Sequence, residues 1–181
     1  MREPVNIAHM FSKADIEKYF LGEKSLSLIF MILGGVAILA AIVFFFVIKT
    51  NMYKGAAIPL IVIGILQLTA AYTVYNRSDK DRTSLVYAYD MNPPLLKDKE
   101  LPRMEKVNSN FKILIFVEIA FIIIGAGLFL YWRNDNSKAL WVGVGMALAA
   151  EGIITLIADA TAKKRADTYT QGLRQFTEKG R

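Results

Sequence analysis

Four apolar runs of about 20 residues each dominate this chain of 181 residues, of which 54% are hydrophobic. A soluble helix of that length would carry a polar face, and these runs carry almost none. An α-helix of about 20 residues crosses the roughly 30 Å of hydrocarbon in a bilayer. We therefore predict an all-α integral membrane protein, a single membrane domain over residues 1–181. Its four transmembrane helices are expected at residues 26–48, 55–75, 113–132 and 139–160.

Lysine and arginine are distributed unevenly around these runs. Of the 22 Lys and Arg residues, only four lie in the short connections 49–54 and 133–138. The others lie before the first run, between the second and third, and after the fourth. Positively charged loops stay on the cytoplasmic side of a membrane. We expect a protein of the bacterial inner membrane with both termini in the cytoplasm, whose basic residues face the lipid bilayer and not nucleic acid.

A short amphipathic segment precedes the first run. Over residues 11–22, apolar side chains gather on one helical face and charged side chains on the other. Ser12 has the side chain of a helix N-cap, and Gly22 is suited to end a helix. This pattern predicts a separate interfacial helix lying on the inner membrane surface.

Helical patterns also continue beyond the second and fourth spans. Residues 79–90 and 163–179 place apolar side chains at helical spacing, which predicts cytoplasmic helical extensions and an amphipathic tail over 161–181. The remainder of the central cytoplasmic segment 76–112 holds three prolines among charged residues at 91–102, which predicts a loop. The outer connections are so short that the spans must pair as two antiparallel hairpins.

The two halves of the chain share a common spacing. A shift of 84 residues aligns Gln67 with Glu151 and Gly34 with Glu118 without a gap. Identical residues are few, so the alignment favours a duplicated hairpin only through its spacing. Such a duplication would be a parallel repeat with a pseudo-twofold axis along the membrane normal.

Two glutamates, Glu118 and Glu151, lie inside the third and fourth spans. A carboxylate in hydrocarbon costs roughly 2.5–3.5 kcal/mol on insertion scales, so such a residue faces a partner or the bundle interior. The fourth span carries a stripe of small and polar residues spaced four apart, formed by Gly143, Ala147, Glu151, Thr155 and Asp159. Residues at this spacing share a helix face. We expect both glutamates to lie in one polar pocket next to this stripe.

No lysine or arginine lies deep in any span, so the glutamates have no salt-bridge partner there. Burial favours the neutral acid, which can donate a hydrogen bond to a group such as Gln67. The candidate binding or proton-handling residues are Glu118, Glu151, Gln67, Thr155 and Asp159. The candidate helix-packing residues are Gly34, Gly35, Gly143 and Ala147. Three roles stay open for the glutamates: protonated packing groups, handling of protons or cations, and polar contacts to another membrane protein.

Motifs of known enzymes are absent from the sequence. There is no phosphate-binding glycine loop and no serine nucleophile elbow, and the chain has no cysteine and a single histidine, His9. We expect no cofactor, no metal centre and no enzymatic activity. We favour a non-enzymatic interaction protein, an accessory, inhibitory or immunity-type subunit that binds a membrane protein or forms homo-oligomers. The alternative is an oligomeric proton- or cation-coupled transporter or channel using Glu118 and Glu151. An enzyme acting on lipid headgroups is the least favoured class.

Overall fold

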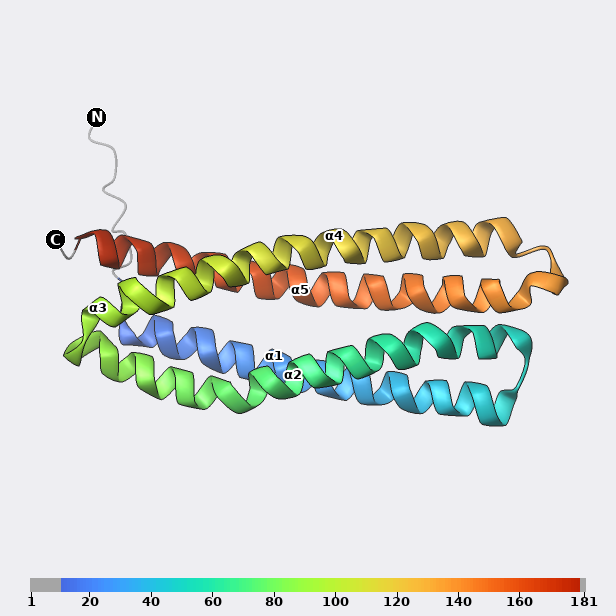
Figure 1. Ribbon diagram of the computed structural model, residues 1–181, viewed down its shortest axis with the longest axis horizontal. Helices are drawn as coiled ribbons and strands as arrows, with labels where there is room; N and C mark the ends of the chain where they lie inside the picture. Colours follow the sequence, from blue (N-terminus) through green and yellow to red (C-terminus); the bar gives the residue numbers. More distant parts are fainter. Residues whose placement is uncertain (1–10, 180–181) are drawn as a thin grey trace, which may run out of the picture.

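The computed structural model describes residues 11–179, and this part of the chain contains no strand. Its four long helices run side by side (Figure 1). They are α1 (Lys13–Val43), α2 (Asn51–Met91), α4 (Leu101–Trp132) and α5 (Ala139–Lys179). All four are long and apolar enough to cross a membrane. The prediction of an all-helical chain with four apolar spans is confirmed.

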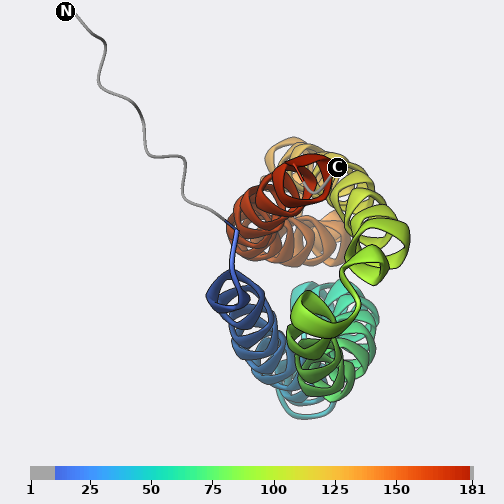
Figure 2. The same ribbon diagram turned by 90° about the vertical axis from the view of Figure 1, so that its left-hand side faces the viewer.

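The helices form two antiparallel hairpins that meet along their second members. α1 packs against α2 and α4 packs against α5, while α2 and α5 join the two hairpins. In the most apolar stretch of each helix, 28% of the residues of α2 and 33% of those of α5 are buried inside the bundle. The corresponding shares are 17% for α1 and 11% for α4. Viewed end-on, the hairpins stack as two pairs (Figure 2). Therefore α2 and α5 form the centre of the bundle, and α1 and α4 flank it.

The turns at the tips of the hairpins are tight and capped. α1 ends in a π-helical turn (Phe44–Ile48), after which Lys49 adopts a left-handed φ of 62° that reverses the chain. Thr50 then caps the start of α2 with its side chain. In the second hairpin, a 3₁₀ turn (Asn136–Lys138) capped by Asp135 leads into α5. These short connections hold each pair of helices antiparallel, as the sequence predicts.

The separate helix predicted over residues 11–22 is wrong, because α1 continues without a break through Gly22. Ser12 does begin the helix, since its backbone N–H and its hydroxyl both donate to Asp15 Oδ2 at 2.8 Å. Gly22 leaves space for the side chain of Arg165 on α5: a Cβ there would lie 2.3 Å from Nη1 of Arg165. Glycine tolerates helical geometry when its neighbours favour it, so local preference alone did not end the helix.

The central segment 76–112 contains no extended loop, contrary to the prediction, and only Asn92 interrupts its helices. α3 (Pro93–Leu95) is a single turn, and a π-helical turn (Leu96–Glu100) leads from it into α4. Proline in the first turn of a helix loses no hydrogen bond, and its fixed φ suits the helix. The proline pair therefore starts α3, and Pro102 lies in the first turn of α4. These prolines mark a sharp reversal of direction within an otherwise helical segment.

The helices that follow the second and fourth predicted spans are confirmed as continuations of α2 and α5. Each of these helices has 41 residues, or roughly 60 Å at 1.5 Å per residue. That is about twice the thickness of the hydrocarbon core. The part of the bundle beyond the predicted spans, at the left of Figure 1, is called the head and comprises residues 11–25, 76–112 and 161–179.

The head contains the main hydrophobic core of the described chain. Tyr19 stacks on Tyr169 with ring centroids 4.3 Å apart, and Tyr89 stacks on Phe176 at 4.9 Å. All four long helices contribute to this aromatic core. Its buried members are Phe11, Ile16, Tyr19, Phe20, Leu85, Leu96, Met104, Ala166, Tyr169 and Leu173.

The two hairpins pair their helices with the same spacing. In the first hairpin, a Cβ on Gly34 would lie 3.2 Å from the backbone nitrogen of Leu68. In the second, a Cβ on Gly152 would lie 3.0 Å from the carbonyl oxygen of Glu118. Under the 84-residue shift, Gly34 corresponds to Glu118 and Leu68 corresponds to Gly152, so the two contacts are at equivalent positions. The glycine lies on the first helix of the first hairpin and on the second helix of the second hairpin. The agreement concerns geometry, and duplication of the hairpin stays a prediction.

Candidate functional site

Glu151 lies where the two hairpins meet. Nε2 of Gln67, on α2, donates a hydrogen bond of 3.0 Å to Oε2 of Glu151, on α5. The glutamate is only 7% exposed. An amide can donate to a carboxyl oxygen whether or not the acid carries a proton, so this contact needs no cation. The bond joins the hairpins at a depth where the sequence predicts hydrocarbon outside the bundle.

Glu118 contacts a different part of α5. Its carboxyl group faces the carboxyl group of Asp159 and the hydroxyl group of Thr155. The residue is 6% exposed, and its Oε2 accepts no hydrogen bond from the described residues. The Thr155 hydroxyl donates to the backbone carbonyl of Glu151 at 2.9 Å. Two carboxyl groups that face each other form a hydrogen bond only when one of them carries a proton.

The structure brings all five candidate residues together, but as two contacts and not as one pocket. They are Gln67, Glu118, Glu151, Thr155 and Asp159. Glu151 bonds to α2, whereas Glu118 lies beside the next two turns of α5. α4 and α5 approach closely here, where Gly152 lies against the Glu118 backbone, and the two glutamate side chains contact different groups. The expected shared pocket is therefore replaced by a polar strip along α5.

Three of the four predicted packing residues lie at helix contacts. Gly34 meets Gly64 reciprocally, since a Cβ on either would lie 2.7 or 2.9 Å from the other's carbonyl oxygen. A Cβ on Gly143 would lie 1.7 Å from a carbonyl oxygen of α2, and Ala147 is buried. Gly35 differs, because a Cβ there would meet no atom within 4 Å. Its predicted role in packing is wrong for contacts within the described chain.

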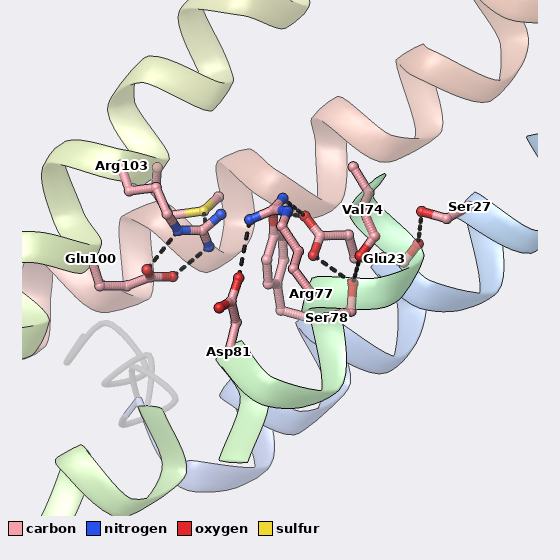
Figure 3. Close-up of polar contacts among 10 residues, drawn as sticks. Glu23, Ser27, Val74, Arg77, Ser78, Asp81, Glu100 and Arg103 are labelled. Carbon is pink, nitrogen blue, oxygen red and sulfur yellow. Dashed lines mark hydrogen bonds and ion pairs between the residues drawn. The ribbon is translucent and has the colours of Figure 1, made fainter. Parts of the chain in front are cut away.

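A polar network in the head was not predicted from the sequence (Figure 3). Oε1 of Glu23, on α1, accepts a hydrogen bond from Arg77 Nη2 of α2 at 3.0 Å and one from the Tyr19 hydroxyl at 3.3 Å. Its Oε2 accepts from the Ser78 hydroxyl at 3.0 Å, and Arg77 Nη1 also donates to Asp81 at 3.1 Å. The network ties α1 to α2 immediately beyond the first span. The contacts that join the two helices, from Glu23 to Arg77 and to Ser78, connect residues more than 50 positions apart, so no local spacing signals them.

A second ion pair in the head joins Glu100 to Arg103 (Figure 3). Arg103 donates from Nε and Nη2 to the two carboxylate oxygens, each at 2.7 Å, and Glu100 is 3% exposed. Burial alone would lower the pKa of Arg103, but the paired carboxylate outweighs it and raises that pKa. Burial and the nearby Glu100 carboxylate likewise raise the pKa of Tyr169. The two residues are three positions apart, a spacing at which side chains meet on a helix. The pair was not predicted because the sequence pattern at 91–102 predicts a loop.

No protein-family model, curated protein or solved structure matches the chain. Within residues 11–179, no three His, Cys, Asp or Glu side chains lie close enough together to hold a metal ion. His9 lies outside the described residues. The function is therefore argued from the geometry of the bundle.

Proposed function

We propose that the chain is a non-enzymatic protein of the bacterial inner membrane that acts by binding another membrane protein or a second copy of itself. In this proposal both termini and the head lie in the cytoplasm. The role is that of an accessory, inhibitory or immunity-type subunit. One observation carries the proposal: two glycines within the spans, Gly35 and Gly127, face no other part of the described chain, residues 11–179.

The open positions stand out against the other glycines of the predicted spans. A Cβ on Gly35 of α1 or on Gly127 of α4 would have no atom within 4 Å. At every other glycine described in the spans, a Cβ would lie within 3.0 Å of an atom of another helix. These packed glycines are Gly34, Gly55, Gly64, Gly125, Gly143, Gly145 and Gly152.

An open glycine on a lipid-facing helix suits contact with another helix. Glycine in a helix interior is less stable than alanine by roughly 0.5–1 kcal/mol, so it needs a compensating role. In membranes, small residues let a second backbone approach closely, and that close packing drives helix association. Gly35 and Gly127 lie on α1 and α4, the two flanking helices, where a partner has direct access. This placement supports intermolecular contact.

Single cysteines test the proposal directly, because the chain has none of its own. A photoactivatable crosslinker is attached to Gly35→Cys or Gly127→Cys in native membranes. We expect a discrete adduct at both positions, either with the same chain or with one defined membrane protein. The adduct is detected on gels and identified by mass spectrometry.

Leu66→Cys is the matched control, because Leu66 lies on α2 within a span and is 64% exposed. A lipid-facing position without a partner should give only weak, diffuse crosslinking. If Leu66→Cys captures the same species as strongly as Gly35→Cys, the adducts report random collisions. That result would overturn the interaction proposal.

A second candidate function rests on the carboxyl pair of Glu118 and Asp159. Two facing carboxyl groups without a lysine or arginine in any span form a natural site for a proton or a small cation. The close backbone contacts between α2 and α5, at Gly55 and Gly143, exclude a water-filled path between these helices at that level. A transporter or channel of this kind would therefore run its path along the α4–α5 side or between copies.

Flux measurements test this candidate. Purified protein in liposomes should carry protons or a monovalent cation down a gradient, and Glu118→Gln or Asp159→Asn should abolish the flux. Glu151→Gln is the matched control, since Glu151 is engaged by Gln67 and an amide at this position keeps an oxygen acceptor. Equal flux in the wild type and in both pair variants would eliminate the candidate.

A further inference from the structure

A groove in the head is lined by residues of α1 and α5. These two helices lie at the left of the end-on view (Figure 2). Its volume is about 620 Å³, and it opens to the surface. Aromatic side chains from the head core, Tyr19 and Tyr169, form part of its wall. The groove is large enough to receive the polar headgroup of a lipid.

The groove is cationic. Lys18 of α1 and Lys164 and Arg165 of α5 line it, and the lining contains one carboxylate, Asp15. Asp15 Oδ2 accepts hydrogen bonds from the backbone N–H and the hydroxyl of Ser12, which it holds in the helix cap. The groove therefore has three positive side chains and one carboxylate, which is already hydrogen-bonded to Ser12. This excess of positive charge attracts anions.

Arg165 is the central feature of this groove. Its guanidinium is half-buried and lies over Gly22, where any side chain would displace it. It forms no ion pair with the residues that the structure describes. The neighbouring carboxylate, Glu23, already accepts hydrogen bonds from Arg77, Ser78 and Tyr19. Burial lowers the pKa of Arg165, and the arginine still stays charged at any physiological pH. A half-buried guanidinium with no ion-pair partner among the described residues is available to bind an anion.

The end of the groove nearest the predicted spans lies at the depth of the phosphate layer of a bilayer. Arg165 lies five residues beyond the end of the fourth predicted span, or roughly 7 Å along the helix. Lys164 lies one residue nearer to the span. The headgroup region extends roughly 5–8 Å beyond the hydrocarbon on each side of a membrane. Both side chains are therefore level with lipid phosphates when the spans cross the membrane.

We propose that this groove binds the phosphate group of an anionic membrane lipid, with the Arg165 guanidinium as its anchor and Lys18 and Lys164 as flanking charges. A guanidinium group can donate two parallel hydrogen bonds to a phosphate group. A lysine ammonium group attracts the phosphate as a point charge and does not fix its orientation. Tyr19 and Tyr169 lie further from the predicted spans than Arg165, so the aromatic wall lies beside the headgroup, on the cytoplasmic side of the phosphate. The inference rests on the proposed membrane placement and is independent of any protein partner.

The test uses the full-length protein, purified in detergent and depleted of lipid. Phosphatidylglycerol is titrated in, and bound lipid is counted by native mass spectrometry. We expect one tightly bound lipid, and Arg165→Gln should weaken its binding by about tenfold or more, as loss of a charge-assisted contact does. The double variant Lys18→Gln/Lys164→Gln, at two exposed positions, should weaken binding even if Arg165→Gln fails to fold.

Arg174→Gln is the matched control, because Arg174 lies on the same helix and outside the groove and pairs with Glu105 at 2.6 Å. It removes the same charge and should leave binding unchanged. Equal weakening by Arg174→Gln, or equal binding of neutral phosphatidylcholine, would overturn the proposal. If inorganic phosphate at matched concentration displaces the lipid, the groove takes soluble phosphates and the lipid assignment is wrong. Failure of lipid binding would leave crosslinking at Gly35 and Gly127 unaffected.

Discussion

The spans and the head pack the same four helices in different ways. In the spans, α1 meets α2 at Gly34 and Gly64 with backbone against backbone, and α4 meets α5 at a similar glycine contact. In the head, stacked rings such as Tyr19 and Tyr169 separate the helices and fill the space between them. Polar contacts change as well, from an amide–carboxyl bond in the spans to ion pairs in the head.

This difference follows from the surroundings that each half would have in a membrane. In water, burial of large apolar side chains drives helices together. In lipid that driving force is absent between helices, so association depends on close packing and on interhelical hydrogen bonds. The change from small to aromatic contacts occurs close to the predicted inner ends of the spans. It supports the proposed placement of the head outside the hydrocarbon.

The largest effect is expected from opening the aromatic core of the head. Phe20 is 1% exposed, so Phe20→Ala leaves a cavity and should lower the free energy of unfolding by about 3–5 kcal/mol. Chemical unfolding in mild detergent, followed by circular dichroism, measures this loss. Phe116→Ala is the control, because Phe116 lies on α4 within a span and is 73% exposed. Similar losses of unfolding free energy in the two variants would show that burial of apolar side chains away from water does not stabilise the head.

An intermediate effect is expected from separating the backbones in the spans. Gly34→Leu places a side chain where even a Cβ would lie 2.7 Å from a carbonyl oxygen of Gly64. Overpacking of this kind should lower the free energy of unfolding by about 1–3 kcal/mol. Gly35→Leu, one residue further on, enters open space and should leave the unfolding free energy unchanged.

Substitutions at Gly34 and Gly35 therefore test packing within the chain and packing between chains separately. Unfolding in detergent should distinguish the two variants. Crosslinking in native membranes from a probe at Leu39→Cys, one turn further along α1 and 64% exposed, should be lost when Gly35→Leu is added. Equal destabilisation by both variants would contradict the structure of the first hairpin. Retained crosslinking in Gly35→Leu would contradict the proposed partner contact.

The sequence predicts the four long apolar helices well, because runs of this length and composition have a clear pattern in the sequence. It fails where a residue is compatible with two local structures. Gly22 suits both a helix end and a position packed against the Arg165 side chain, and the prolines around Asn92 suit both a loop and a helix start. Tertiary packing decides such cases. The glutamates show the same limit: the sequence indicates Gln67 as a hydrogen-bond partner of a buried glutamate, but only the three-dimensional packing shows that Gln67 donates to Glu151 and that Glu118 lies elsewhere.

The smallest effect is expected from the polar bond between the hairpins. Gln67→Leu removes the donor to Glu151 and should lower the free energy of unfolding by about 0.6 kcal/mol, the average for such bonds within membranes. The loss is small because the unfolded chain in a membrane also finds polar partners. Thr69→Val is the control, since the Thr69 hydroxyl donates to a carbonyl of its own helix at 2.8 Å. A loss for Gln67→Leu above that for Gly34→Leu would mean that polar contacts, more than close backbone packing, hold the spans together.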